Sequence, residues 1–156
     1  MYRINIPGFK ELDIKYLVSD LNGTLTNKGI MKETTAALLN KIAQNLKVYI
    51  ITADTYGKAG EACRNLRADL AILRTGREKE EKAFFVKELG CQETVTLGNG
   101  ANDELMLEQA ALGIVVMGEE GCSTRSLYKA DIVVKDIDDA LSMLLDPEIV
   151  KATLRA

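Results

Sequence analysis

The residues of this chain that could do chemistry are polar side chains close to the ends of short apolar runs. Asp20 follows one run, Thr52 ends another, Lys82 lies in a charged segment and Asp103 closes a glycine-rich turn. A carboxylate nucleophile, a hydroxyl, an ammonium group and a second carboxylate suit phosphoryl transfer, which needs a metal ion and donors for the phosphoryl oxygens. Each residue alone has a structural explanation, such as a turn threonine or a solvated lysine. The ordered set indicates phosphoryl-transfer chemistry.

The elements that must position these residues are short apolar runs that alternate with amphipathic stretches. The runs predict buried strands over Leu17–Leu21, Val48–Ala53, Leu70–Leu73, Val95–Leu97, Ile114–Met117 and Ile132–Val134. The stretches between and after them predict helices over Lys32–Leu46, Tyr56–Leu66, Glu78–Leu89, Asp103–Ala110, Asp138–Leu145 and Pro147–Leu154. This alternation favours a three-layer α/β fold, in which right-handed crossovers place helices on both faces of a mainly parallel sheet.

The carboxyl ends of parallel strands lie along one edge of a sheet, and α/β proteins bind their ligands there. Asp20 lies at the end of the first predicted strand, Thr52–Asp54 lies at the end of the second, and the turn Gly98–Asp103 follows the fourth. Lys82 belongs to the predicted helix Glu78–Leu89, which precedes the predicted strand Val95–Leu97. We therefore expect all of them to meet at one edge of the sheet.

Length and composition indicate a single domain over residues 1–156, with residues 1–14 as an edge strand (Arg3–Ile6) or an arm. The net charge of −3 gives no basic surface for nucleic acid. No apolar run is long enough to span a membrane, and the N-terminus lacks a signal-peptide pattern. Three cysteines without metal-binding spacing indicate free thiols in a reducing compartment, so we expect a cytoplasmic protein. The absence of histidine excludes His-based triads and His metal sites.

Four segments, taken in order, resemble the motifs of a known family. Asp20-Leu21-Asn22-Gly23-Thr24-Leu25-Thr26 resembles the first motif of the haloacid dehalogenase (HAD) superfamily, most closely that of P-type ATPases. Ile51–Asp54 resembles the Thr-Gly-Asp segment of those ATPases, and Lys82 precedes apolar residues at helical spacing, as their lysine does. Leu97–Asp103 resembles their Gly-Asp-Gly-x-Asn-Asp motif, and Ala130–Val134 also has a counterpart there. The resemblance covers most of the chain and implies a Rossmann-like HAD fold.

The resemblance implies a role for each matching residue. Asp20 would be the nucleophile that becomes an aspartyl-phosphate, and Asn22 occupies the position of the catalytic acid/base. The phosphoryl group would be held by side chains and backbone amides of Leu21, Gly23, Thr52, Ala53 and Lys82. Mg²⁺, which prefers oxygen ligands, would be held by Asp20, the carbonyl of Asn22, Asn99 and Asp103. The supporting residues would be Thr24, Asp54, Gly98 and Asn102.

Two positions depart from the family pattern. Asn22 stands where many phosphatases of the superfamily have an acid/base Asp, and an amide cannot transfer that proton. Losing a general acid/base typically costs ~10²–10⁴-fold in rate, so we expect slow hydrolysis. Asn99 stands where the common pattern has an Asp that binds Mg²⁺, so we also expect weaker Mg²⁺ affinity.

The motifs are separated by stretches that leave no room for the cap domains of superfamily phosphatases. Members without a cap cover the site by oligomerising or accept large, open substrates. We therefore expect a homo-oligomer whose substrate is a phosphorylated small molecule or an exposed phosphoryl group on a larger molecule. The leading hypothesis is a slow Mg²⁺-dependent phosphatase that works through an aspartyl-phosphate at Asp20. The alternative is a catalytically impaired HAD-fold module that binds a phosphorylated or protein partner.

Overall fold

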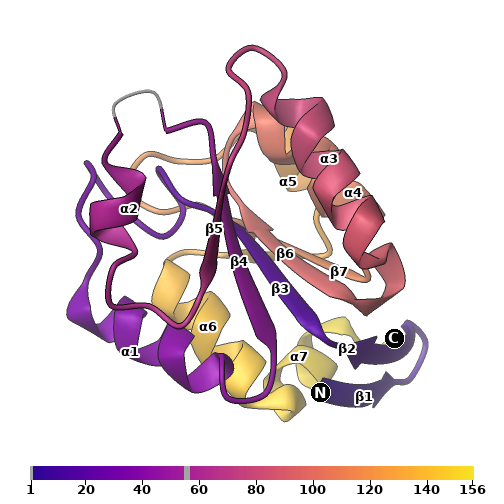
Figure 1. The fold of residues 1–156 in the computed structure, drawn as a ribbon. Coiled ribbons are helices and arrows are strands. Elements are labelled where there is room, and N and C mark those ends of the chain that lie inside the picture. Colours follow the sequence, from indigo (N-terminus) through magenta and orange to yellow (C-terminus); the bar gives the residue numbers. More distant parts are fainter. Residues whose placement is uncertain (1, 55–56) are drawn as a thin grey trace.

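A six-stranded parallel sheet forms the middle layer of the fold, and helices cover both of its faces (Figure 1). The computed structural model describes residues 2–54 and 57–156. The strands stand in the order β5-β4-β3-β6-β7-β8. Their bounds are β3 (Tyr16–Asp20), β4 (Lys47–Thr52), β5 (Asp69–Ile72), β6 (Thr94–Gly98), β7 (Leu112–Val116) and β8 (Ile132–Val134). Each predicted strand is present within one or two residues of its predicted ends, and the α/β fold class is confirmed.

Apart from the last helix, which packs against the N-terminal segment, the helices form two groups, one on each face of the sheet (Figure 1). Their bounds are α1 (Glu33–Ile42), α2 (Ala59–Ala62), α3 (Glu78–Leu89), α4 (Glu104–Gln109), α5 (Thr124–Lys129), α6 (Ile137–Leu145) and α7 (Pro147–Leu154). α1, α2 and α6 lie on one face, whereas α3, α4 and α5 lie on the other. Successive strand residues point to opposite faces, so Ile50 packs in the larger core with α1 and α6. Ile51 packs in the smaller core under α3 and α4.

Three helices differ from the sequence-based expectation. α1 ends at Ile42 rather than Leu46, because the chain continues there in successive turns. α2 is a single turn within the predicted helix Tyr56–Leu66, and Gly60 in its middle is a weak helix former. Tyr56 itself lies outside the described residues. α5 was not predicted, because Ser126 is its only fully buried residue and no apolar stripe marks it.

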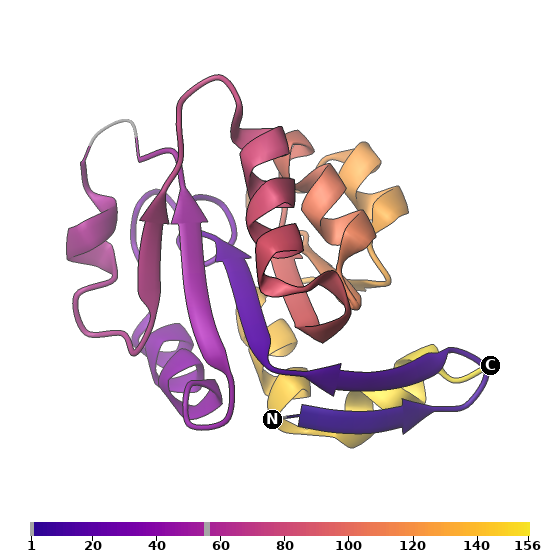
Figure 2. The same ribbon diagram turned by 45° about the vertical axis from the view of Figure 1, so that its right-hand side comes forward.

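The N-terminal segment forms a β-hairpin of its own rather than an edge strand of the main sheet or an arm. β1 (Tyr2–Ile6) pairs antiparallel with β2 (Lys10–Ile14) in a separate two-stranded sheet. Tyr2, Ile4 and Ile6 are buried in alternation with exposed residues, so one face of the hairpin joins the core. The hairpin lies beside α7 and the C-terminus (Figure 2). The backbone N–H of Ala156 donates to the carbonyl of Pro7 at 3.0 Å.

The strand register brings the predicted motifs to one edge of the sheet. β3 lies between β4 and β6, with Asp20 opposite Ile51 on one side and Ser19 opposite Leu97 on the other. Asp20, Thr52 and Gly98 are the last residues of these three strands. The expected convergence of the motifs is therefore confirmed. No helix in residues 2–54 and 57–156 has the length and apolar character needed to cross a membrane.

Candidate active site

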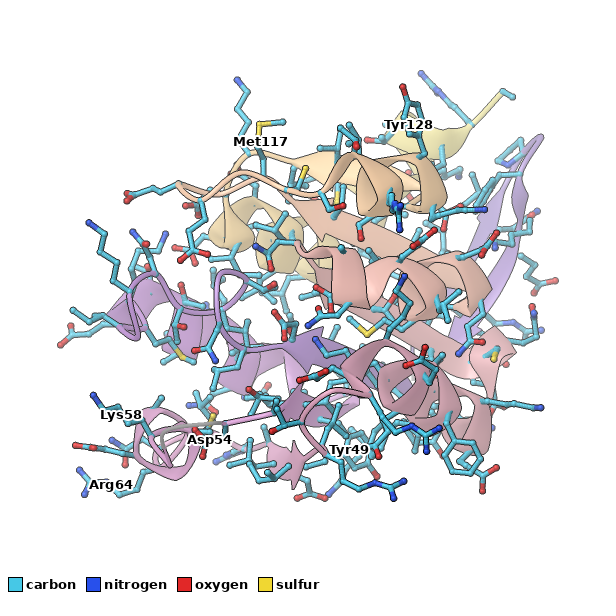
Figure 3. All side chains as sticks on the ribbon, turned by 90° about the horizontal axis from the view of Figure 1, so that it is seen from above. Tyr49, Asp54, Lys58, Arg64, Met117 and Tyr128 are labelled. Atoms are coloured by element: carbon cyan, nitrogen blue, oxygen red, sulfur yellow. The ribbon has the colours of Figure 1, made fainter. Side chains whose placement is uncertain are left out.

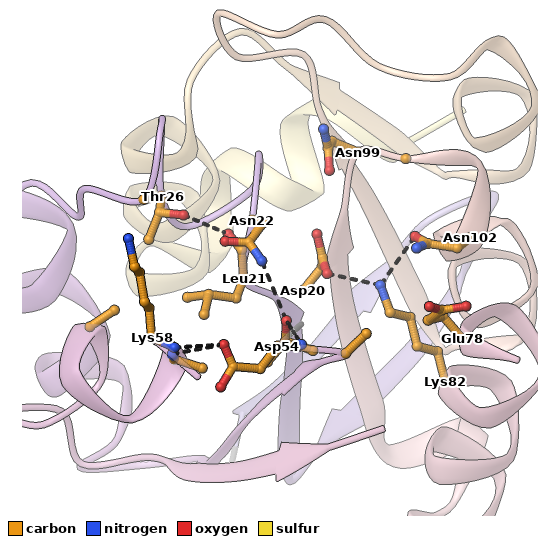
Figure 4. A pocket seen from close by; sticks show the side chains of 16 residues that line it. Asp20, Leu21, Asn22, Thr26, Asp54, Lys58, Glu78, Lys82, Asn99 and Asn102 are labelled. Atoms are coloured by element: carbon orange, nitrogen blue, oxygen red, sulfur yellow. Dashed lines mark hydrogen bonds and ion pairs between the residues drawn. The ribbon is translucent and has the colours of Figure 1, made fainter. Parts of the chain in front are cut away.

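A cavity of about 600 Å³ opens where β3, β4 and β6 end (Figure 4). Most of the predicted site residues line it, namely Asp20, Leu21, Asn22, Thr52, Ala53, Asp54, Lys82, Asn99 and Asn102. The remaining predicted residues, Gly23, Thr24, Gly98 and Asp103, lie outside its lining. Sequence reasoning missed two charged residues of the lining, Lys58 and Glu78. Lys58 directly precedes α2 and Glu78 begins α3, and this position at the start of a helix that follows a strand was the one signal that could have identified them.

A buried lysine connects the two carboxylates of the site. Lys82 is only 1% exposed, and its Nζ lies 2.8 Å from Oδ1 of Asp20 and 2.8 Å from Oδ1 of Asp103. It also donates to Oδ1 of Asn102 at 3.2 Å (Figure 4). Asp20 is 7% exposed and Asp103 is fully buried. Because an unpaired charge is costly to bury, the three charged groups depend on one another.

The protonation of this cluster follows from its burial and its charges. The pKa of Asp20 is raised to about 7, first by burial and then by the charge of Asp103, although Lys82 and Thr24 lower it. Burial lowers the pKa of Lys82, but the charges and hydrogen bonds of Asp20 and Asp103 outweigh burial and raise it. Lys82 therefore remains a cation at neutral pH, and Asp20 beside it is fully ionised only above its pKa of about 7.

The second oxygen of Asp20 faces Thr24 and Asn99. Oγ1 of Thr24 lies 3.2 Å from Oδ2 of Asp20 and 3.1 Å from Oδ1 of Asn99. A carboxylate oxygen and an amide oxygen thus lie on two sides of one hydroxyl. The described residues contain no group of three or more His, Cys, Asp or Glu side chains that could hold a metal ion. The oxygens available here fit a hard cation such as Mg²⁺, but with a single carboxylate among them.

Asp103 supports the site from behind the cavity wall. Its Oδ2 accepts hydrogen bonds from the backbone N–H groups of Asn99 and Gly100, both at 2.9 Å. Its Oδ1 accepts from Lys82, so both oxygens are engaged. A side-chain carbon on Gly98 would lie 2.6 Å from Cβ of Asp103, which explains the glycine at the end of β6. The predicted role of Asp103 as an Mg²⁺ ligand stays a prediction, whereas its contacts hold Lys82 and the Asn99 turn in place.

On the opposite side of Asp20, Asn22 and Thr52 face each other. Nδ2 of Asn22 lies 3.5 Å from Oγ1 of Thr52, which also accepts from the backbone N–H of Asp54 at 3.3 Å. Asp54 has a positive φ of 40°, and its Oδ1 accepts from the backbone N–H groups of Lys58 and Ala59. Asp54 therefore ties the end of β4, where Thr52 lies, to the start of α2. The exposed side chain of Lys58 makes no ion pair with another described residue and runs along the cavity wall (Figure 4).

Comparison with known proteins gave one relative in sequence and many in fold. No protein-family model matches the chain. The chain is 45% identical over 84 residues to the uncharacterized protein MJ0073 of Methanocaldococcus jannaschii, a match that covers 51% of this chain and 90% of that protein.

The similar solved structures share the fold at low sequence identity. A Legionella pneumophila protein described as a HAD superfamily (subfamily III A) hydrolase has a TM-score of 0.71 at 17% identity, covering 90% of this chain and 87% of its own. The cobalt-bound deoxy-D-mannose-octulosonate 8-phosphate phosphatase of Haemophilus influenzae has a TM-score of 0.72 at 12% identity, covering 92% and 94%. The 3-deoxy-D-manno-octulosonate 8-phosphate phosphatase of Moraxella catarrhalis, in complex with magnesium, phosphate and KDO, has a TM-score of 0.69 at 17% identity, covering 89% and 93%.

Proposed function

Because this chain belongs to the same family as the uncharacterized Methanocaldococcus jannaschii protein and has the fold of HAD hydrolases, we propose that it is a phosphatase working through an aspartyl-phosphate at Asp20. The observation that carries the proposal is the contact between Asp20 and Lys82 at the wall of an open cavity. A nucleophilic carboxylate beside the lysine cation, with Thr52 across the cavity, suits the transfer of a phosphoryl group.

In the first step, Oδ1 of Asp20 attacks the phosphorus atom, and the bond between phosphorus and the leaving oxygen breaks. The leaving oxygen takes the electron pair of that bond. Lys82 contacts this Oδ1 and neutralises part of the charge that the phosphoryl group brings into the site. The hydroxyl of Thr52 and the backbone amides that follow Asp20 supply hydrogen bonds to the phosphoryl oxygens.

Proton transfer is the weak point of this site. Asn22 faces Thr52 across the cavity, at the place where an acid/base would serve the leaving group, but its amide cannot give or take a proton. The leaving oxygen must take its proton from water, and the water that later attacks the aspartyl-phosphate has no carboxylate base at position 22. We therefore expect good leaving groups to react and the phosphoenzyme to hydrolyse slowly.

The oxygens beside Thr24 would hold a divalent cation, and we propose Mg²⁺. Its ligands would be Oδ2 of Asp20, the backbone carbonyl of Asn22 and Oδ1 of Asn99. When bound, the cation would supply positive charge that stabilises the phosphoryl oxygens during transfer. Asp103 was also predicted as a ligand; because both of its oxygens are engaged, we propose that it instead fixes Lys82 and the Asn99 turn from behind.

The substrate that we propose is a phosphorylated small molecule or an exposed phosphoryl group on a larger one. Two of the similar structures are phosphatases of a sugar-acid phosphate, which favours the first class. Lys58 and Glu78 are two further charged residues of the cavity wall that could face the rest of the substrate. We also propose that the chain acts as one catalytic unit without a cap and covers its site by forming a homo-oligomer.

A generic phosphatase assay with p-nitrophenyl phosphate and Mg²⁺ tests the proposal. We expect measurable turnover by the native chain and none by Asp20→Asn, which keeps the shape of the side chain but removes the nucleophile. Asn22→Asp restores an acid/base and should raise the rate, by about 10²-fold or more. Turnover that survives Asp20→Asn would refute the proposed mechanism.

A further inference from the structure

A carboxylate that none of the predicted motifs contains lies against the Asp20 loop. A Cβ placed on Gly23 would lie 2.5 Å from Oε2 of Glu120 and 2.7 Å from Nδ2 of Asn99. The Glu120 carboxylate and the amide nitrogen of Asn99 therefore meet at the same face of Gly23, whereas Oδ1 of Asn99 faces Thr24. Gly23 is the residue that directly follows the carbonyl of Asn22, one of the oxygens proposed to hold the cation.

The loop that carries Glu120 is fixed on both sides. It leaves β7 through Gly118, whose N–H donates to the carbonyl of Lys135 at 2.8 Å. Nδ2 of Asn27 donates to Oε2 of Glu119 at 2.5 Å, which ties the loop to the segment after Asp20. On the other side, the N–H of Ser123 donates to the carbonyl of Asn99 at 2.8 Å. The loop on both sides of Glu120 is thus tied to the segment after Asp20 and to the Asn99 turn.

The position of Glu120 favours a role in binding the cation over a role in proton transfer. The Asn22 side chain points to Thr52, on the side of the cavity where the leaving group would lie. Glu120 lies instead beside Asn99, and the cavity that it lines also contains Gly23 and Thr24. In the view from above, Met117, which begins this loop, lies on the side of the molecule opposite to Asp54 and Lys58 (Figure 3).

Charge gives the reason for a carboxylate at this point. Asn22 and Asn99 are neutral, and Asp103 is fully engaged with Lys82 and two backbone amides. Asp20 alone therefore supplies negative charge to a cation, and Lys82 offsets part of it. The exposed Glu120 side chain makes no hydrogen bond or ion pair with another residue in the described part of the chain, so its charge is available.

We propose that Glu120 supplies the negative charge that Asn99 lacks, and that it acts through a water molecule on a divalent cation held by Asp20 and Oδ1 of Asn99. The inference rests on the proposed function, because that function places the cation between Asp20 and Asn99. It adds a residue from a different loop to the site. It also explains how the fold keeps a metal site with an amide at position 99.

Calorimetric titration of the chelator-treated chain with Mg²⁺ alone, without substrate, tests this inference. Changing Glu120→Gln removes the charge and keeps the size of the side chain. Loss of a residue that positions or supports a metal ligand typically costs ~10–100-fold in metal affinity, and we expect a loss in that range. The matched control is Glu119→Gln, one residue earlier in the same loop, which keeps an oxygen for Asn27 and should bind Mg²⁺ as the native chain does.

A second variant makes the test specific. Adding Asn99→Asp to Glu120→Gln returns one carboxylate to the site and should restore most of the Mg²⁺ affinity. Binding of Mn²⁺, followed by electron paramagnetic resonance, compares the native chain and the variants independently. Equal Mg²⁺ affinity of Glu120→Gln and the native chain, or an equal loss in Glu119→Gln, would overturn the inference, as would a native chain that binds no cation. The proposed function fails by a different result, the absence of Asp20-dependent turnover, which does not depend on the affinity ranking.

Discussion

Replacing Lys82 by methionine tests how far the site depends on its buried cation. Methionine has a similar length and fills the same space, so the change removes the charge and little packing. In the native chain, Nζ of Lys82 lies 2.8 Å from a carboxylate oxygen of Asp20 and 2.8 Å from one of Asp103. Without it, two carboxyl groups that are 7% and 0% exposed face each other with no cation between them.

The size of the effect follows from this burial. Removing one partner of a buried ion pair typically destabilises a protein by about 3–5 kcal/mol, because the remaining charge is left uncompensated. The pKa of Asp20 is about 7 even though Lys82 lowers it, so it rises further in Lys82→Met. A carboxyl with a higher pKa in the folded state binds a proton on folding, so stability falls as pH rises from its unfolded pKa toward its folded pKa. We therefore expect the largest loss near pH 8 and a clearly smaller loss near pH 5.

Urea unfolding followed by circular dichroism at both pH values measures the loss. The matched control is Lys79→Met in the same helix, because Lys79 pairs with Glu104 at 3.2 Å but keeps a side chain that is 30% exposed. A partly exposed pair of this kind contributes at most about 1 kcal/mol. If Lys82→Met lost no more free energy of unfolding than Lys79→Met, or lost the same amount at both pH values, the reasoning about the buried cluster would be refuted.

Three further changes test other parts of the account. Asn99→Asp should bind Mg²⁺ more tightly than the native chain, by roughly 10-fold in a calorimetric titration, and an unchanged affinity would contradict its place beside the cation. Burial alone would raise the pKa of Asp138, but hydrogen bonds from threonines of α1 lower it. Asp138→Asn should therefore lower the free energy of unfolding in urea by about 1–2 kcal/mol at pH 7. This loss should become progressively smaller as the pH falls below about 4. Gly113→Ala would place a carbon 2.3 Å from the carbonyl oxygen of Leu107, so it should lower stability by about 1–3 kcal/mol, whereas an unchanged melting temperature would mean that β7 and α4 are not in close contact.

The apolar runs predicted the sheet because buried parallel strands leave a strong and local signal. Leu17, Ile50 and Leu97 lie in three neighbouring strands of one core, and runs of this kind have few other uses in a folded chain. The hairpin of residues 2–14 was missed although Tyr2, Ile4 and Ile6 alternate with polar residues. What the sequence does not contain is the partner of each strand, and β1 pairs with β2 rather than with the main sheet.

The sequence predicted which residues form the candidate site better than it predicted the contacts between them. Asp20, Thr52 and Lys82 could be placed because each lies in or beside an element with a clear pattern. The engagement of both Asp103 oxygens depends on the turn at Asn99 and Gly100, which the fold creates and no local pattern specifies. Glu120 was missed for the same reason, because its approach to Gly23 depends on how two distant loops meet.

The measurement that tests the central claim most directly is the detection of a phosphoryl group on Asp20. The native chain is incubated with acetyl phosphate and Mg²⁺, quenched in acid and digested, and its peptides are analysed by mass spectrometry. We expect a phosphoryl adduct on the peptide that contains Asp20, removed by hydroxylamine and absent from Asp20→Asn. Because the native chain should hydrolyse its aspartyl-phosphate slowly, the adduct should be easier to detect there than in Asn22→Asp. No adduct on the native chain, or the same adduct on Asp20→Asn, would contradict the account.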